Sequence, residues 1–190
     1  MSVRAQFVLA RGWSSTAIQL VGGGTRTLGF SHVDIILPPE WIRPQDGVNP
    51  TRPALLGARS DVIGGKPAGV QVRPWDYGVG TWIRQVVMEL PATAAEEALF
   101  YGFAREQLGK PYDKLAILAF FTGRNWRDEE AWFCSELLCA SLENSHLCPD
   151  IYAPANKINP TEAAIILSAL GAKITGEPAL SQPLDPPAAA

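Results

Sequence analysis

The chain has 190 residues, a net charge of −3, an apolar fraction of 47% and a charged fraction of 18%. This length suits one domain with a substantial core, and the composition is typical of a soluble globular protein. Because the basic residues form no stripe along the chain, the charge pattern predicts no nucleic-acid partner.

The first 24 residues hold one short apolar patch, residues 7–10, between Arg4 and Arg11. This patch is shorter than the core of a signal peptide and far shorter than a membrane span. We therefore expect no signal peptide and no membrane span, and a chain that is cytoplasmic as made.

Apolar runs separated by glycine-rich turns predict strands in the first half of the chain. These runs are residues 5–10, 17–21, 30–37, 54–58, 69–75 and 81–90. Residues 38–53 contain five prolines, which exclude a central strand or a regular helix, so this segment is predicted to be a long surface loop.

Helix signals begin at residue 93. Thr93 and Glu96 fit a capping box ahead of a helix that ends near Gly109, and Asn159 with the following proline predicts a helix over 160–170. Further helices are expected at 113–121 and 133–144. Strands followed by helices predict a single α+β domain over 1–175, an antiparallel β-sheet packed by helices, with a Pro/Ala-rich tail at 176–190.

Cys134 stands at the head of one of these predicted helices, and His32 shares one face of its strand with Asp34. A helix N-terminus and a neighbouring histidine are the two features that turn a thiol into a nucleophile. Taken alone, the pattern also fits a packing cysteine and a structural histidine. A helix that started at Asp128 would place Cys134 in the second turn.

The remaining cysteines point to no metal site. Cys139 lies about 140° around the helix from Cys134 and is expected in the core, while Cys148 and His146 are too few ligands for zinc. No metal and no cofactor is predicted. Glu136 is expected to form a structural salt bridge.

Three segments in chain order, "FSHVDIIL", "LGKPYD" and "WFCSELL", carry a family resemblance. Together they resemble the permuted branch of the NlpC/P60 papain-like superfamily, the YiiX-like and lecithin:retinol acyltransferase-like proteins, in which the His strand precedes the Cys helix. The resemblance spans residues 28–168 and implies a circularly permuted papain-like fold.

The resemblance assigns roles to residues. It makes Cys134 the nucleophile at the start of its helix, His32 the general base, and Tyr112 a substrate-binding residue. Trp132 is close enough in sequence to Cys134 to wall a cleft beside it.

One position departs from the pattern. The acid that YiiX-like proteins tend to carry on the next strand falls on Gly57, so the group that orients His32 is open. Asp34 ranks first, followed by Asp61, Gln71 or a backbone carbonyl.

The resemblance implies a cysteine-dependent amide hydrolase with a thioester intermediate that acts on peptidoglycan peptides, with lipid or ester chemistry second. The rival hypothesis is a catalytically silent component of a phage tail or another virion assembly, because phage proteins carry segments similar to "SHVD" and "LLGARSD". The two hypotheses differ in whether a cleft leads to Cys134 or whether Trp132, Phe133 or the 38–53 loop closes it.

Overall fold

The protein is described from a computed structural model, over residues 1–10, 29–113, 131–149 and 158–176, and all structural statements refer to these residues. They form an antiparallel sheet of six strands in the order β4-β3-β2-β1-β5-β6. The strands are β1 (Ser2–Ala10), β2 (His32–Leu37), β3 (Ala54–Arg59), β4 (Gly69–Pro74), β5 (Trp82–Pro91) and β6 (Lys173–Gly176). The predicted strand at 17–21 lies outside the described residues, and β6 was not predicted.

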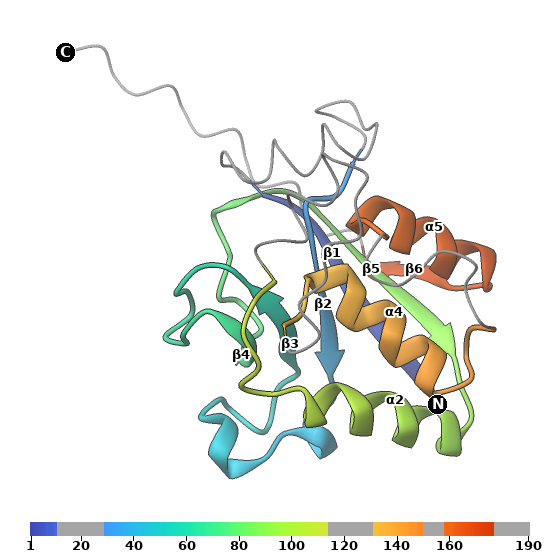
Figure 1. Cartoon of the computed structure of the whole chain (residues 1–190), viewed down its shortest axis with the longest axis horizontal. Helices are drawn as coiled ribbons and strands as arrows, with labels where there is room; N and C mark the ends of the chain where they lie inside the picture. The colour runs from blue at the N-terminus through green and yellow to red at the C-terminus, as the bar shows by residue number, and fades with distance from the viewer. Residues whose placement is uncertain (11–28, 114–130, 150–157, 177–190) are drawn as a thin grey trace.

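Three α-helices accompany the sheet: α2 (Ala94–Glu106), α4 (Cys134–Asn144) and α5 (Pro160–Ala169). Helices α2 and α4 pack on each other and lie on one face of the sheet, whereas α5 lies beside β5 and β6 (Figure 1). The predicted α+β class, an antiparallel sheet packed by helices, is therefore confirmed. The helix expected at 113–121 falls almost wholly outside the described residues.

The central strand β2 is buried on both of its faces. Val33, Ile35 and Leu37 join the main hydrophobic core under the helices. The alternate residues His32 and Asp34 project from the other side of the strand and are only 8% and 2% exposed. The period-2 pattern thus places two ionisable groups inside the protein.

The start of α5 links the two elements that carry the candidate site. Thr161 Oγ1 accepts the backbone N–H of Phe30 at 3.0 Å, two residues before His32. Ser135 Oγ donates to the carbonyl of Ile158 at 2.5 Å, one residue after Cys134. The segment 158–161 therefore holds the beginning of β2 close to the beginning of α4.

This segment keeps its shape through the predicted cap of α5. Asn159 Oδ1 accepts the N–H groups of Thr161 and Glu162 at 2.9 and 3.0 Å, and the Glu162 carboxylate accepts the N–H of Asn159 at 2.8 Å. These contacts form a capping box, which satisfies N–H groups that a helix start leaves unpaired.

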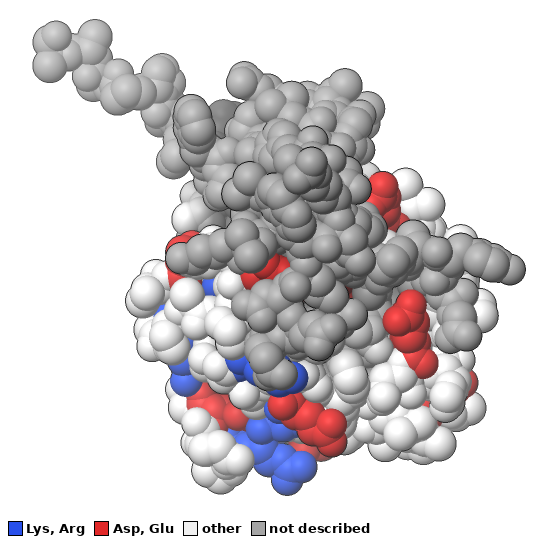
Figure 2. All heavy atoms as spheres, viewed as in Figure 1, with Lys and Arg blue, Asp and Glu red and all other residues white. Residues whose placement is uncertain are grey.

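The 38–53 loop contains two short 3-10 turns, η1 (Pro39–Trp41) and η2 (Pro44–Asp46), and is anchored to α2. The Arg105 guanidinium donates two hydrogen bonds to the buried Asp46 carboxylate, at 2.9 and 3.0 Å. Around this region acidic and basic side chains are interspersed on the visible surface (Figure 2). No described helix is long and apolar enough to span a membrane.

Replacing Asn159 by Ala should lower the free energy of unfolding by about 1 kcal/mol, because two N–H groups of α5 lose their acceptor. Urea denaturation followed by circular dichroism measures the change. Ser168→Ala, at an exposed position near the end of the same helix, is the matched control and should change the stability by less than half as much. Equal losses in the two variants would contradict a structural role for the cap.

Candidate active site

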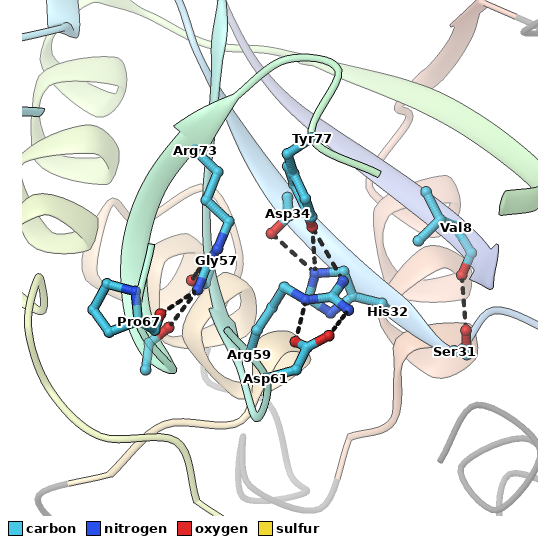
Figure 3. Close-up of polar contacts among 11 residues, drawn as sticks. Val8, Ser31, His32, Asp34, Gly57, Arg59, Asp61, Pro67, Arg73 and Tyr77 are labelled. Atoms are coloured by element: carbon cyan, nitrogen blue, oxygen red, sulfur yellow. Dashed lines mark hydrogen bonds and ion pairs between the residues drawn. The ribbon is translucent and has the colours of Figure 1, made fainter. Parts of the chain in front are cut away.

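His32 and Asp34 form a buried pair on β2. The His32 Nε2 atom lies 3.0 Å from Asp34 Oδ1, and the two side chains are 10% and 1% exposed (Figure 3). A carboxylate on Nε2 fixes the proton on that nitrogen, so Nδ1 is the ring atom that remains available to a thiol. Of the groups that the sequence offered to orient His32, Asp34 is the one in contact with it.

The electrostatics of the site favour the charged forms of both groups. Burial lowers the pKa of His32, but attraction to Asp34 and to the Cys134 sulfur outweighs it and raises the pKa to about 9. Burial raises the pKa of Asp34, but His32 and a hydrogen bond from Tyr77 bring it down to about 2. At neutral pH the pair is therefore an imidazolium beside a carboxylate.

Cys134 is the first residue of α4, with Phe133 in extended conformation at the N-cap. The expectation that Cys134 begins its helix is confirmed, so Cys134 lies in the first turn of α4 and not in the second. A helix N-terminus carries a partial positive charge and unpaired N–H groups, both of which favour an anion at this position. Cys134 is only 2% exposed.

Gly57 on β3 provides the room for Asp34. A Cβ atom built on Gly57 would overlap the Asp34 Oδ1 atom and crowd its carboxyl carbon. A side chain at position 57 and the present rotamer of Asp34 are therefore mutually exclusive. The family pattern places an acid at position 57, and this chain has glycine there. The carboxylate of Asp34, from the neighbouring strand β2, fills the space instead.

Tyr112 lies beside the thiol. Its backbone pairs with Trp132 in an isolated parallel bridge, and its ring lies 5.8 Å from the Phe133 ring. Burial, with a smaller contribution from the electrostatic interaction with Cys134, raises the pKa of Tyr112 well above its usual value. Tyr112 is thus a protonated phenol close to the sulfur, and its role in substrate binding stays a prediction.

Trp132 belongs to the hydrophobic core and is 6% exposed. Its ring packs edge-on against Phe103 of α2 at 5.9 Å, and the Lys110 ammonium lies 5.9 Å from it. These contacts account for its burial, and its predicted place in a cleft wall is untested.

A polar cluster that the sequence did not predict surrounds Tyr77, in the loop between β4 and β5. The Tyr77 hydroxyl donates to Asp34 Oδ2 at 2.6 Å and lies 3.3 Å from His32 Nε2. Arg59 donates to the Tyr77 hydroxyl oxygen at 3.2 Å, and the Asp61 carboxylate in turn accepts two hydrogen bonds from Arg59, of 2.7 and 2.9 Å. A tyrosine in the turn "WDYGVG" carries no sequence signal for this role.

Asp61 and Gln71, the lower-ranked partners for His32, lie elsewhere. Asp61 pairs with Arg59, and Gln71 stands opposite Gly57 in the pairing of β3 with β4. Cys139 is fully buried in the core as expected, and burial raises its pKa. Glu136 accepts the backbone N–H of Phe133 at 3.3 Å, a contact at the start of α4 that the sequence analysis did not foresee.

A search of the solved structures finds a fold neighbour. The chain superposes on the crystal structure of the metalloprotein YiiX from Escherichia coli O157:H7 with a TM-score of 0.59 and 16% identity, over 94% of this chain and 97% of that one. No protein-family model and no curated protein matches the sequence. The chain therefore has the α+β fold of the YiiX-like, papain-like proteins.

YiiX is described as a metalloprotein. Among the residues described here, no group of three or more His, Cys, Asp and Glu side chains is arranged to hold a metal ion.

Replacing Gly57 by Ala should displace Asp34 and so lower the pKa of His32 from about 9 toward 6.5. Titration of the His32 ring by NMR measures this shift. Gly102→Ala is the control, because a Cβ there meets nothing within 4 Å and a helical Gly→Ala change is neutral to stabilising. An unaltered His32 pKa in the Gly57 variant would mean that Asp34 does not need this space.

Asp34→Asn should destabilise the protein at neutral pH, and the difference from the wild type should shrink as the pH falls from about 4 to about 2. The sign follows from the depressed pKa: a carboxylate with a folded-state value of about 2 against 3.8 contributes stability above pH 3.8 and loses it as the pH drops through 2. Urea denaturation across this range is the measurement. A difference that stays constant with pH would contradict the ion pair.

Proposed function

We propose that the protein is a cysteine-dependent hydrolase that cleaves an amide bond, with Cys134 as nucleophile, His32 as general base and acid, and Asp34 as the group that orients His32. The observation that carries this proposal is that a thiol at a helix start interacts with the imidazole of a buried His–Asp pair from a distant part of the chain. The resemblance of the three motif segments supports it, since the papain-like fold that they imply hosts thiol chemistry, and the chain shares the fold of YiiX.

The raised pKa of His32 favours the state in which the imidazole holds the proton given up by the thiol. The Cys134 sulfur then attacks the substrate carbonyl carbon, and the carbonyl oxygen becomes an oxyanion. The backbone N–H of Cys134 and the protonated Tyr112 hydroxyl are the candidate donors to that oxygen. The first donor lies at the start of α4, and Tyr112 pairs with Trp132, two residues before Cys134.

Breakdown of the tetrahedral species needs a proton on the leaving nitrogen, and the His32 imidazolium supplies it. The products at this stage are a free amine and a thioester on Cys134. His32, again neutral, takes a proton from water, and the resulting attack releases the acid and restores the thiol. Asp34 stays ionised throughout and holds the ring in one orientation.

As substrate we propose peptidoglycan peptides, on the basis of the family resemblance of the three motif segments, with lipid or ester substrates as the second class. The low exposure of Cys134 (2%) and His32 (8%) supports an alternative, a papain-like scaffold without turnover that serves as a structural component of a virion. In that case the protein would be assembled with phage tail proteins and would bind no substrate.

The proposal predicts an acyl-enzyme on Cys134. Incubation with peptidoglycan stem peptides, acid quenching and intact-mass measurement should show an adduct on the wild type and none on Cys134→Ala, with free amine released. The same experiment is repeated with ester substrates. Cys139→Ala is the matched control, because that cysteine is buried in the core. Wild-type protein that forms no adduct and releases no amine with either substrate class would favour the silent scaffold.

A further inference from the structure

The Tyr77 hydroxyl is the point where three side chains of the site meet (Figure 3). It lies 2.6 Å from Asp34 Oδ2, 3.3 Å from His32 Nε2 and 3.2 Å from Arg59 Nη1. The partners come from β2 and β3, and Tyr77 comes from the loop after β4. One oxygen atom therefore joins the central strands to a loop that carries none of the predicted catalytic residues.

The Tyr77 hydroxyl can act as donor in one of these contacts and as acceptor in the other two. A phenol has one donor and two lone pairs. Burial, with the negative charge of Asp34 as a smaller contribution, raises the pKa of Tyr77 well above its usual value, so the proton stays on the phenol and points to the Asp34 carboxylate. The lone pairs face the N–H groups of Arg59 and His32. All the hydrogen-bonding capacity of the hydroxyl is thus used inside the cluster.

The Tyr77 ring is held from several sides. The guanidinium carbons of Arg59 and Arg73 lie 5.4 and 5.9 Å from the ring centroid, and Trp82 meets the ring edge-on at 6.1 Å. Gly64 leaves no side chain in the way, since a Cβ there would come within 2.7 Å of the Tyr77 Cβ. A ring with so many fixed neighbours can hold its hydroxyl in one place.

Arg73 connects the Tyr77 ring to the backbone of β3 and β4. It is fully buried, and its guanidinium donates to the carbonyls of Gly57, Pro67 and Gly69 at 2.9, 3.0 and 3.3 Å. Those three carbonyls lie on β3, on β4 and just before β4. The same guanidinium therefore contacts the Tyr77 ring and binds the carbonyl of Gly57. Gly57 is the residue whose missing side chain leaves room for Asp34.

We propose that Tyr77 is a positioning residue of this site: its hydroxyl locks the Asp34 carboxylate by donating to Oδ2 and accepts the His32 Nε2–H, so that Nδ1 stays directed to Cys134. The inference deepens the proposed function, because the ring that Tyr77 positions is the proposed general base. The geometry itself does not depend on turnover.

Removing the hydroxyl has defined consequences. In Tyr77→Phe, Asp34 Oδ2 loses its donor and His32 Nε2–H loses its second acceptor, while the ring contacts remain. We expect the pKa of His32 to fall, the Nδ1–H tautomer to appear, and the alkylation rate of Cys134 near neutral pH to drop about tenfold, the size expected from one hydrogen bond to a charged group.

The experiment is an NMR titration of the two histidines of the chain, His32 and His146, in the wild type and in Tyr77→Phe. The His146 signal is the internal reference, and Tyr101→Phe, which removes a buried hydroxyl on α2, is the matched control. Tyr101→Phe should leave the His32 titration unchanged. A His32 titration and tautomer that are identical in the wild type and in Tyr77→Phe would overturn the proposal.

A double-mutant cycle separates positioning from a general structural effect. If Tyr77 acts through Asp34, Tyr77→Phe should slow alkylation in the wild-type background and have little further effect in Asp34→Asn. Equal effects in both backgrounds would overturn the proposal. Should Tyr77→Phe fail to fold, the wild type still gives an answer, because the His32 and Tyr77 rings must show a nuclear Overhauser contact, and its absence counts against the proposal.

The two proposals fail in different ways. If no acyl-enzyme forms but Tyr77→Phe shifts the His32 titration, the hydrolase proposal falls and the positioning role stands. If an acyl-enzyme forms and Tyr77→Phe changes neither the titration nor the alkylation rate, the positioning role falls and the hydrolase stands.

Discussion

The buried contact between His32 Nε2 and Asp34 Oδ1 is the interaction on which the rest of the site depends. Two charges taken out of water are costly unless each is fully paired, and losing one partner leaves the other uncompensated. The neighbouring strands are built around this pair. Gly57 on β3 leaves the space that the Asp34 carboxylate fills, and the buried Arg73 on β4 fixes the Gly57 carbonyl. A carboxylate, an absent side chain and a guanidinium thus come from three adjacent strands.

The thiol reaches this pair through the architecture of the second half of the chain. Cys134 begins α4, so it sits where the helix offers unpaired N–H groups. The capped start of α5 holds Ser135 on one side and Phe30 on the other, which places the start of the cysteine helix beside the start of the histidine strand. A residue pair about a hundred positions apart in sequence becomes a site because a third segment binds both flanks.

The sequence predicted those parts of the site that follow from local periodicity and capping. The alternation in "FSHVDIIL" put His32 and Asp34 on one face, the capping signals located α2 and α5, and the order of strand and helix signals predicted the α+β fold. The roles of Tyr77, Arg59 and Arg73 could not be predicted, because they rest on contacts between residues far apart in sequence, such as Tyr77 with Asp34 and Arg73 with Gly57. The role of Gly57 follows only from its short distance to Asp34 in the folded protein. The strand β6 is short and exposed, and its sequence has no apolar alternation that would predict a strand.

The most direct test of the account is the pH dependence of Cys134 alkylation, followed by intact mass, in the wild type and in His32→Ala. Cys139 and Cys148 are internal references in the same chain. The account predicts that Cys134 still reacts well below pH 8.5, where an ordinary thiol is largely protonated, and that this reactivity collapses without His32. A Cys134 that reacts no faster than the other two cysteines, or that reacts equally with and without His32, would contradict a thiol–imidazole site.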